Sequence, residues 1–217
     1  MKLLYRIGAL LFPGKCVLCG RKLQRGELDL CGDCREIPGY SQRKLNFQFL
    51  DSFAAVWYYE GYVRKSLLRY KFRNQRSYAA AYGRAVAMML LREYPEGFDL
   101  ITWVPVSRLR KLRRGYDQVE LLAKAVCSEL GTTPCRCLKK IRHNPPQSGI
   151  RSFAERRANV LGAYTVMEPE AIRGKRILLL DDIVTTGATA GECARVLLTA
   201  GAAQVHCAAV AASRKHE

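Results

Sequence analysis

The chain has 217 residues, 49% of them hydrophobic and 25% charged, which is enough apolar material for a core and excludes a disordered chain. No apolar run approaches the roughly 18 residues that a membrane-spanning helix needs. The 36 Lys and Arg residues outnumber 19 Asp and Glu residues, and the net charge of +17 indicates negatively charged partners: nucleic acid, phosphorylated metabolites or an anionic membrane surface.

Residues 1–40 are predicted to form a small metal-binding module ahead of the main domain. Apolar residues between Leu3 and Leu11 recur at helical spacing, which predicts a short amphipathic helix at the start of this module. The same stretch is only faintly similar to a signal peptide, because Arg6 and Gly8 interrupt it and no small-residue cleavage site follows. We therefore expect a soluble protein that stays inside the cell.

The chain has nine cysteines, an odd number that excludes a complete set of disulfides, and the spacing of four of them suggests a metal site. Two CxxC pairs each bracket a tight turn, and four thiolates suit tetrahedral Zn²⁺ with no position left open for catalysis. A redox CxxC would open a helix, and no helix is predicted after either pair. We expect a structural zinc ion, and we expect the other five cysteines to be small core residues. The predicted ligands are Cys16, Cys19, Cys31 and Cys34, and the core set is Cys127, Cys135, Cys137, Cys193 and Cys207.

Residues 41–95 are expected to connect the module to the main domain or to form a hood over it. The segment FAAVWYYE at 53–60 predicts a strand, and the segments 62–71 and 79–93 predict two helices. Between residues 64 and 76 there are six Lys and Arg residues and no acid.

Aromatic residues are interleaved with these cations, which is the combination that stacks bases and follows a nucleic-acid backbone. Core packing is an equally good reading for several of them, because Tyr58 lies in a predicted strand and Tyr78 and Tyr82 share a helix face. The aromatic set is Tyr58, Tyr59, Tyr62, Tyr70, Phe72, Tyr78 and Tyr82.

From residue 99 onward, predicted apolar strands alternate with predicted helices. This order predicts an α/β domain over residues 41–217, with a parallel sheet covered by helices on both faces. The basic, proline-containing segment 140–158 is expected to be a long loop. The predicted strands are 99–106, 135–138, 176–183 and 204–211, and the predicted helices are 117–130 and 188–200.

The segment ILLLDDIVTTGAT at 177–189 predicts a binding site, because ligands of open α/β sheets bind where strands end. Asp181 and Asp182 close the predicted strand, and the small residues Thr185–Thr189 lead directly into a helix whose amino end suits a phosphate. Gly187 lets the backbone come close, and the acids suit vicinal hydroxyls or a hydrated Mg²⁺. Together these features describe a ribose 5-phosphate site. The alternative is an ordinary capped helix, but two acids ending a buried strand are costly without a role.

The same segment resembles the phosphoribosyl pyrophosphate (PRPP) signature of type I phosphoribosyltransferases. The paired CxxC module, YKFR at 70–73, VPVSRLRKLRRGYDQVELLA at 104–123 and RHNPPQSGIRSFAERRANVLGAY at 142–164 resemble the competence protein F (ComF) family. The resemblance covers nearly the whole chain. It implies a type I phosphoribosyltransferase-like α/β fold preceded by a four-cysteine zinc module.

The resemblance also implies roles for individual residues. Asp181 and Asp182 would hold the ribose hydroxyls, the turn at Ser107 and Arg108 would bind pyrophosphate, and Mg²⁺ would accompany PRPP in an active enzyme. The segment 142–158 would close over the substrate. The residues that would wrap the 5-phosphate are Thr185, Thr186, Gly187, Ala188 and Thr189.

Two functions are open at this point. We favour a DNA-uptake protein that binds single-stranded DNA and retains a PRPP site; the alternative is a Mg²⁺-dependent phosphoribosyltransferase, for which no base-recognition element is readable. The ComF resemblance implies a cytoplasmic protein that works beside a helicase and recombination mediators, at the inner membrane face during DNA uptake. The basic residues expected to contact DNA are Arg64, Lys71, Arg73, Arg110, Lys111, Arg113, Arg114, Arg142, Arg156 and Arg157.

Overall fold

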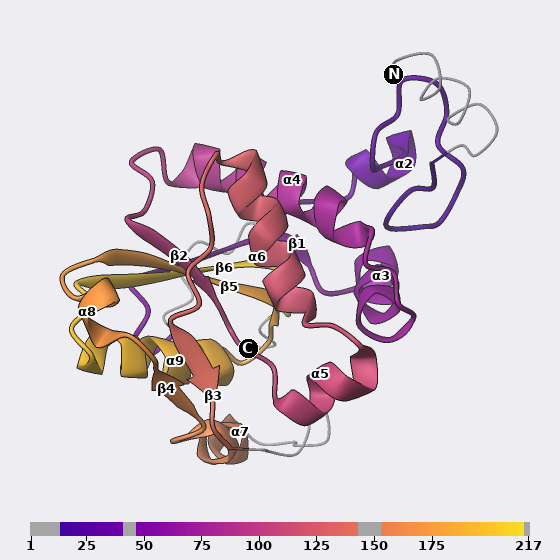
Figure 1. The fold of residues 1–217 in the computed structure, drawn as a ribbon. Helices are drawn as coiled ribbons and strands as arrows, with labels where there is room; N and C mark the ends of the chain where they lie inside the picture. Colours follow the sequence, from indigo (N-terminus) through magenta and orange to yellow (C-terminus); the bar gives the residue numbers. More distant parts are fainter. Residues whose placement is uncertain (1–13, 41–46, 143–152, 215–217) are drawn as a thin grey trace.

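The computed structural model describes residues 14–40, 47–142 and 153–214 (Figure 1). The predicted helix within residues 3–11 lies outside these ranges. The described strands are β1 (Ser52–Tyr58), β2 (Leu100–Trp103), β3 (Leu138–Lys140), β4 (Tyr164–Val166), β5 (Arg176–Val184) and β6 (Gln204–Ala212). The described helices are α2 (Gly32–Arg35), α3 (Gly61–Phe72), α4 (Tyr78–Glu93), α5 (Arg108–Arg114), α6 (Gln118–Glu129), α7 (Phe153–Val160), α8 (Pro169–Ile172) and α9 (Ala188–Thr199).

In the described part of the chain, four parallel strands form the main sheet in the order β1-β6-β5-β2. The sheet has helices on both faces, as the alternating apolar pattern predicted: α4 and α6 lie above it in Figure 1 and α9 lies below. Side chains of β5 alternate between the two cores, so Leu178 and Leu180 pack toward α4 and α6 while Ile177 and Leu179 pack toward α9.

Residues 52–93, expected as a connecting segment or hood, contribute an edge strand and a covering helix to this layered arrangement. Strand β1 pairs with β6, and α4 packs against α6. The helices approach closely because Gly83 has no side chain; a Cβ there would lie 2.5 Å from Ala125 Cβ.

The aromatic residues of this region divide between core and surface. Tyr58, Tyr70 and Tyr82 are buried, so for these three the core reading is the better one, whereas Tyr62 and Phe72 are exposed. Base stacking on this part of the described surface is therefore left to a small number of rings.

Two local predictions are wrong. The short strand expected at 135–138 begins only at Leu138, where β3 pairs antiparallel with β4. The expected loop 140–158 is helical from Phe153 onward, because the segment FAERRANV of α7 contains good helix formers and packs against α9. Residues 143–152 of that segment lie outside the described ranges. Among the described residues, no helix combines the length and the apolar character needed to traverse a bilayer.

Candidate functional site

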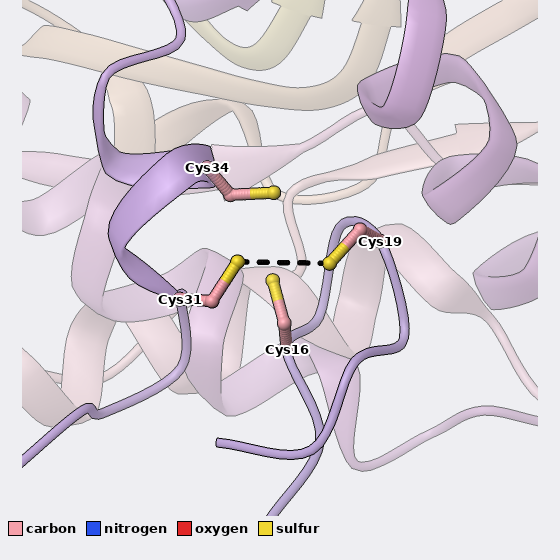
Figure 2. Close-up of side chains that lie close together, drawn as sticks. All are labelled: Cys16, Cys19, Cys31 and Cys34. Carbon is pink, nitrogen blue, oxygen red and sulfur yellow. Dashed lines mark hydrogen bonds between the residues drawn. The ribbon is translucent and has the colours of Figure 1, made fainter. Parts of the chain in front are cut away.

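The four predicted metal ligands converge on one point (Figure 2). The sulfurs of Cys16, Cys19, Cys31 and Cys34 all lie within 4.8 Å of one another, and Cys19 Sγ is 3.6 Å from Cys31 Sγ. Four Zn–S bonds in a tetrahedron would hold sulfurs ~3.8 Å apart, so the cluster fits a zinc ion closely. The donors are thiolates alone, which is the ligand set of structural sites.

Local sequence produces this convergence in two ways. In the first pair, Gly20 adopts a positive φ of 83° and its amide donates to the Cys16 carbonyl, which closes a tight turn. The second pair begins a helix, contrary to prediction: α2 starts directly after Cys31, and one helical turn carries Cys34 back to the same side. Of the other five cysteines, Cys135 is half-buried, and four lie in the core as expected: Cys127, Cys137, Cys193 and Cys207.

The cysteine module is fixed to helices α3 and α4. The Ser66 hydroxyl donates to the Val17 carbonyl, and Arg69 donates to the Leu18 carbonyl at 2.6 Å. Arg84 of α4 donates one hydrogen bond to each carboxylate oxygen of Asp29, both at 2.7 Å. Such bidentate pairs add geometric specificity, so the module has a defined position on these helices.

The acidic pair lies inside β5 rather than at its end. Along β6 the pairing continues past Asp181 to Val184, whereas β2 stops where Trp103 pairs with Leu180. The acids therefore lie just beyond the carboxyl end of β2, at the sheet edge where the sequence placed a ligand. Strand alternation directs Asp181 toward α9 and Asp182 toward α3 and α6.

The loop after β5 forms a hollow. Asp181 and residues 183–190 line a hollow of about 240 Å³, a volume that includes open solvent at its mouth. Gly187 has a φ of +73° and caps the amino end of α9. A Cβ atom at this position would lie 2.1 Å from the ring of Phe47. Only glycine fits there without strain, because the Phe47 ring packs directly against the loop at this position. The predicted phosphate-binding residues Thr185, Thr186, Ala188 and Thr189 are brought together at this helix end.

Both acids are buried, and the surroundings of Asp181 shift the pKa of its carboxyl group. Burial, and then the neighbouring Asp182 carboxylate, raise the pKa of Asp181 well above its usual range. On the same side, the Lys140 ammonium lies 3.2 Å from the Tyr164 hydroxyl, and burial lowers the pKa of Lys140 to about 8. A neutral Asp181 is a hydrogen-bond donor as well as an acceptor, which suits sugar hydroxyls.

Asp182 has two partners that the sequence analysis did not place here. Lys71 Nζ, at the end of α3, lies 2.9 Å from one carboxylate oxygen, and Gln118 Nε2, in the first turn of α6, lies 3.0 Å from the other. Lys71 had been expected to contact DNA. One feature of the sequence could have placed Gln118 near the acidic pair. It lies in the first turn of a helix predicted from residue 117, which directly follows the arginine-rich segment.

The expected pyrophosphate turn is a helix. Ser107 is buried and caps α5, its hydroxyl accepting from the Arg110 amide at 3.4 Å, while Arg108 is exposed. Asp117 ties this segment to α6, since its carboxylate accepts from the Val106 amide at 3.4 Å and from the amides of Val119 and Glu120, both at 3.0 Å. Ser107 and Arg108 thus follow β2 at the edge that holds the acidic pair.

Several expected DNA contacts gather where α3 ends beside α5. The Arg114 guanidinium lies over the exposed Phe72 ring at 4.9 Å, and Arg76 donates to the Gly115 carbonyl at 3.1 Å. We call this region the α3–α5 basic surface; it comprises Phe72, Arg73, Arg76, Arg113 and Arg114.

Other basic residues predicted to contact DNA lie apart or are engaged. Lys111 pairs with Glu120 at 3.1 Å, and Arg142 donates to the Leu161 carbonyl at 3.2 Å. Arg64 is exposed on α3, and Arg110 is half-buried on α5. Arg156 and Arg157 belong to α7, but their side chains lie outside what the structure describes.

Comparison with known proteins agrees with this arrangement. The family model of the phosphoribosyl transferase domain matches residues 120–217. Competence protein ComFC of Bacillus subtilis (strain 168) is 26% identical over 87% of this chain and 73% of its own length. Competence protein F of Haemophilus influenzae is 26% identical over 88% of this chain and 81% of its own.

A third relative is more similar: DNA utilization protein YhgH of Salmonella typhi is 30% identical, over 88% of this chain and 80% of its own length. The matched domain contains β5, its acidic pair and the loop before α9, and the four-cysteine cluster stands ahead of it near the amino end. The chain therefore belongs to the ComF/YhgH family of competence and DNA utilization proteins.

Proposed function

We propose that this protein binds single-stranded DNA during DNA uptake and holds a 5-phosphoribosyl ligand at residues 181–189. The observation that carries the ligand site is the hollow at the amino end of α9, lined by Asp181 and the small residues after it. Amides at a helix amino end attract a phosphate, and an adjacent carboxyl group accepts or donates hydrogen bonds to sugar hydroxyls.

The cysteine cluster holds a structural zinc ion in this proposal. Its four sulfurs offer a closed tetrahedral shell, and the module supplies carbonyls that α3 binds through Ser66 and Arg69. Residues 1–40 then form the zinc module, and residues 41–217 form the phosphoribosyltransferase-like domain.

The α3–α5 basic surface is the proposed path for DNA. It combines exposed arginines with one exposed ring, Phe72, and the names of the relatives as competence and DNA utilization proteins favour a nucleic-acid role. Its partners in this role would be a helicase and a recombination mediator of DNA uptake, at the cytoplasmic face of the inner membrane.

The two surfaces are expected to be separable by mutation. Replacing both acids, Asp181→Asn with Asp182→Asn, should abolish PRPP binding, because Asp182 loses its charge and both side chains lose one of their two oxygens while their size is kept. Affinity for a single-stranded oligonucleotide should stay within about twofold. Calorimetric titration of each ligand measures both, and circular dichroism checks that the variant is folded. Loss of both affinities in a folded variant would refute the two-surface proposal.

The salt dependence of DNA binding tests the basic surface. Arg73→Ala with Arg113→Ala should weaken oligonucleotide binding and reduce the slope of log K against log salt by about 1.4, roughly 0.7 for each lost phosphate contact. A matched control with the same charge change is Arg173→Ala with Lys175→Ala, next to α8 on the opposite side of Figure 1. Equal slopes in the test variant and the wild type would remove this surface from the DNA path.

Transferase activity is the second candidate. It is favoured by the position of the acidic pair, the hollow and the arginine-rich α5, all of which lie at the sheet edge beyond the end of β2. In that case Ser107 and Arg108 would hold the pyrophosphate as the glycosidic bond to a nitrogenous base forms. Release of pyrophosphate from PRPP in the presence of candidate bases distinguishes an enzyme from a binding protein.

A further inference from the structure

The charges around the acidic pair are unusual for a site that would recruit a divalent cation. Asp182 already has an ammonium at 2.9 Å and an amide donor at 3.0 Å, one on each carboxylate oxygen. Arg114 is half-buried in the same field: burial lowers its pKa, and the Asp182 charge opposes that shift. Asp181 is held toward its neutral form by burial. Lys71 and Arg114 together therefore at least balance the negative charge of the acidic pair.

The backbone that carries Lys71 is held in place by contacts of the neighbouring residue, Tyr70. The preceding residue, Tyr70, is fully buried and its hydroxyl donates to the Gln118 carbonyl at 2.6 Å. The Tyr116 hydroxyl in turn donates to the Tyr70 carbonyl. The Lys71 side chain is only 18% exposed and Asp182 only 4%, so the ion pair is largely shielded from water. A cation fixed in this way costs little further ordering when a ligand binds.

These residues do not fit Mg²⁺. Magnesium needs near-octahedral oxygen ligands and keeps several of its waters, and it is usually held by one or two carboxylates with substrate phosphates. Here both oxygens of the Asp182 carboxylate are already engaged by Lys71 and Gln118, and burial holds the neighbouring Asp181 toward its neutral form. A hydrated dication at Asp182 would have to displace an ammonium and would be repelled by it.

We propose that the Lys71 ammonium takes the place of the divalent cation at the acidic pair, so that this site binds its phosphorylated sugar without Mg²⁺. The inference rests on the proposed 5-phosphoribosyl site and specifies its cation requirement. Lys71 neutralises Asp182, which would otherwise repel the phosphate, and each carboxylate oxygen keeps a second lone pair that can accept from a sugar hydroxyl. Lys71 is thus a positioning residue of the sugar site and not a DNA contact.

Titration of ribose 5-phosphate tests this directly, because a single phosphate binds Mg²⁺ only weakly in solution. The zinc-loaded protein is titrated by calorimetry in buffer freed of divalent cations on a resin, since a soluble chelator would attack the cysteine cluster, and again with millimolar Mg²⁺. The wild-type affinities are expected to agree within about twofold. Without Mg²⁺, the variants Lys71→Ala and Lys71→Met should bind ribose 5-phosphate about tenfold or more weakly than the wild type. Adding Mg²⁺ should restore much of the lost affinity.

Lys65→Ala is the matched control, because this lysine is exposed on the same helix and lies over the Tyr62 ring. It should behave as the wild type in both buffers. Binding by the wild type only when Mg²⁺ is present would overturn the inference and leave the sugar site intact. No binding in either buffer would defeat the proposed sugar site and the inference with it. Unchanged affinity in both Lys71 variants would also overturn the assigned role.

Discussion

Removing the metal from the four-cysteine module should unfold the module and lower the stability of the whole chain. Structural zinc binds such cysteine sets with about 10–16 kcal/mol of apparent free energy, all of which is folding free energy when no site exists beforehand. Cys16→Ser with Cys34→Ser should therefore reduce zinc content from one equivalent to near zero. The thermal midpoint should fall by several degrees, because α3 and α4 lose their contacts with Val17, Leu18 and Asp29.

Metal analysis of the purified protein and thermal unfolding measure the two effects. Cys135→Ser is a suitable control, since this cysteine is half-buried and outside the cluster; its zinc content should equal that of the wild type. One full equivalent of zinc in the double cysteine variant would contradict the assigned ligand set.

Gly187→Ala is expected to have the second large effect. The new methyl group would meet the Phe47 ring at 2.1 Å, and its residue would have to keep a φ of +73°. Left-handed backbone costs ~1–2 kcal/mol for a non-glycine residue, and overpacking a core costs ~1–3 kcal/mol, so we expect ~2–5 kcal/mol of destabilisation. Chemical denaturation measures this loss, and ribose 5-phosphate binding should fall with it because the loop must move.

A second substitution separates the two causes. Phe47→Ala removes the ring, so Gly187→Ala should cost less in that background, with only the backbone strain remaining. Strictly additive losses in the double variant would show that the ring contact is not the source of the effect. A stable Gly187→Ala protein with unchanged sugar binding would contradict the described loop.

The fold was largely predictable because its signals are local. Alternating apolar strands and helices gave the parallel sheet and its two covering layers, and the glycine within small hydroxyl residues marked the loop before α9. The cysteine spacing likewise marked the cluster. Each of these patterns lies within about twenty consecutive residues.

The contacts of Asp182 were not predictable for the opposite reason. They join three elements that are far apart in the chain: the end of α3, the start of α6 and strand β5. No periodicity in residues 61–72 tells a lysine that ends near an acid from one that faces solvent, so Lys71 was grouped with its exposed neighbour Arg73. For Tyr70 and Tyr82 the sequence left core packing and base stacking equally open, because an aromatic residue in a basic segment suits either environment; both residues are buried.

The strand order also has a consequence for how the polypeptide acquires its structure during synthesis. The two central strands of the sheet, β5 and β6, come last in the sequence, and the strands made first, β1 and β2, pair with them. A nascent chain leaving the ribosome therefore cannot complete the described sheet until β6 emerges, whereas the four cysteines of the module are available much earlier. Until β6 has been made, the apolar faces of β1 and α4 lack the strand against which they pack.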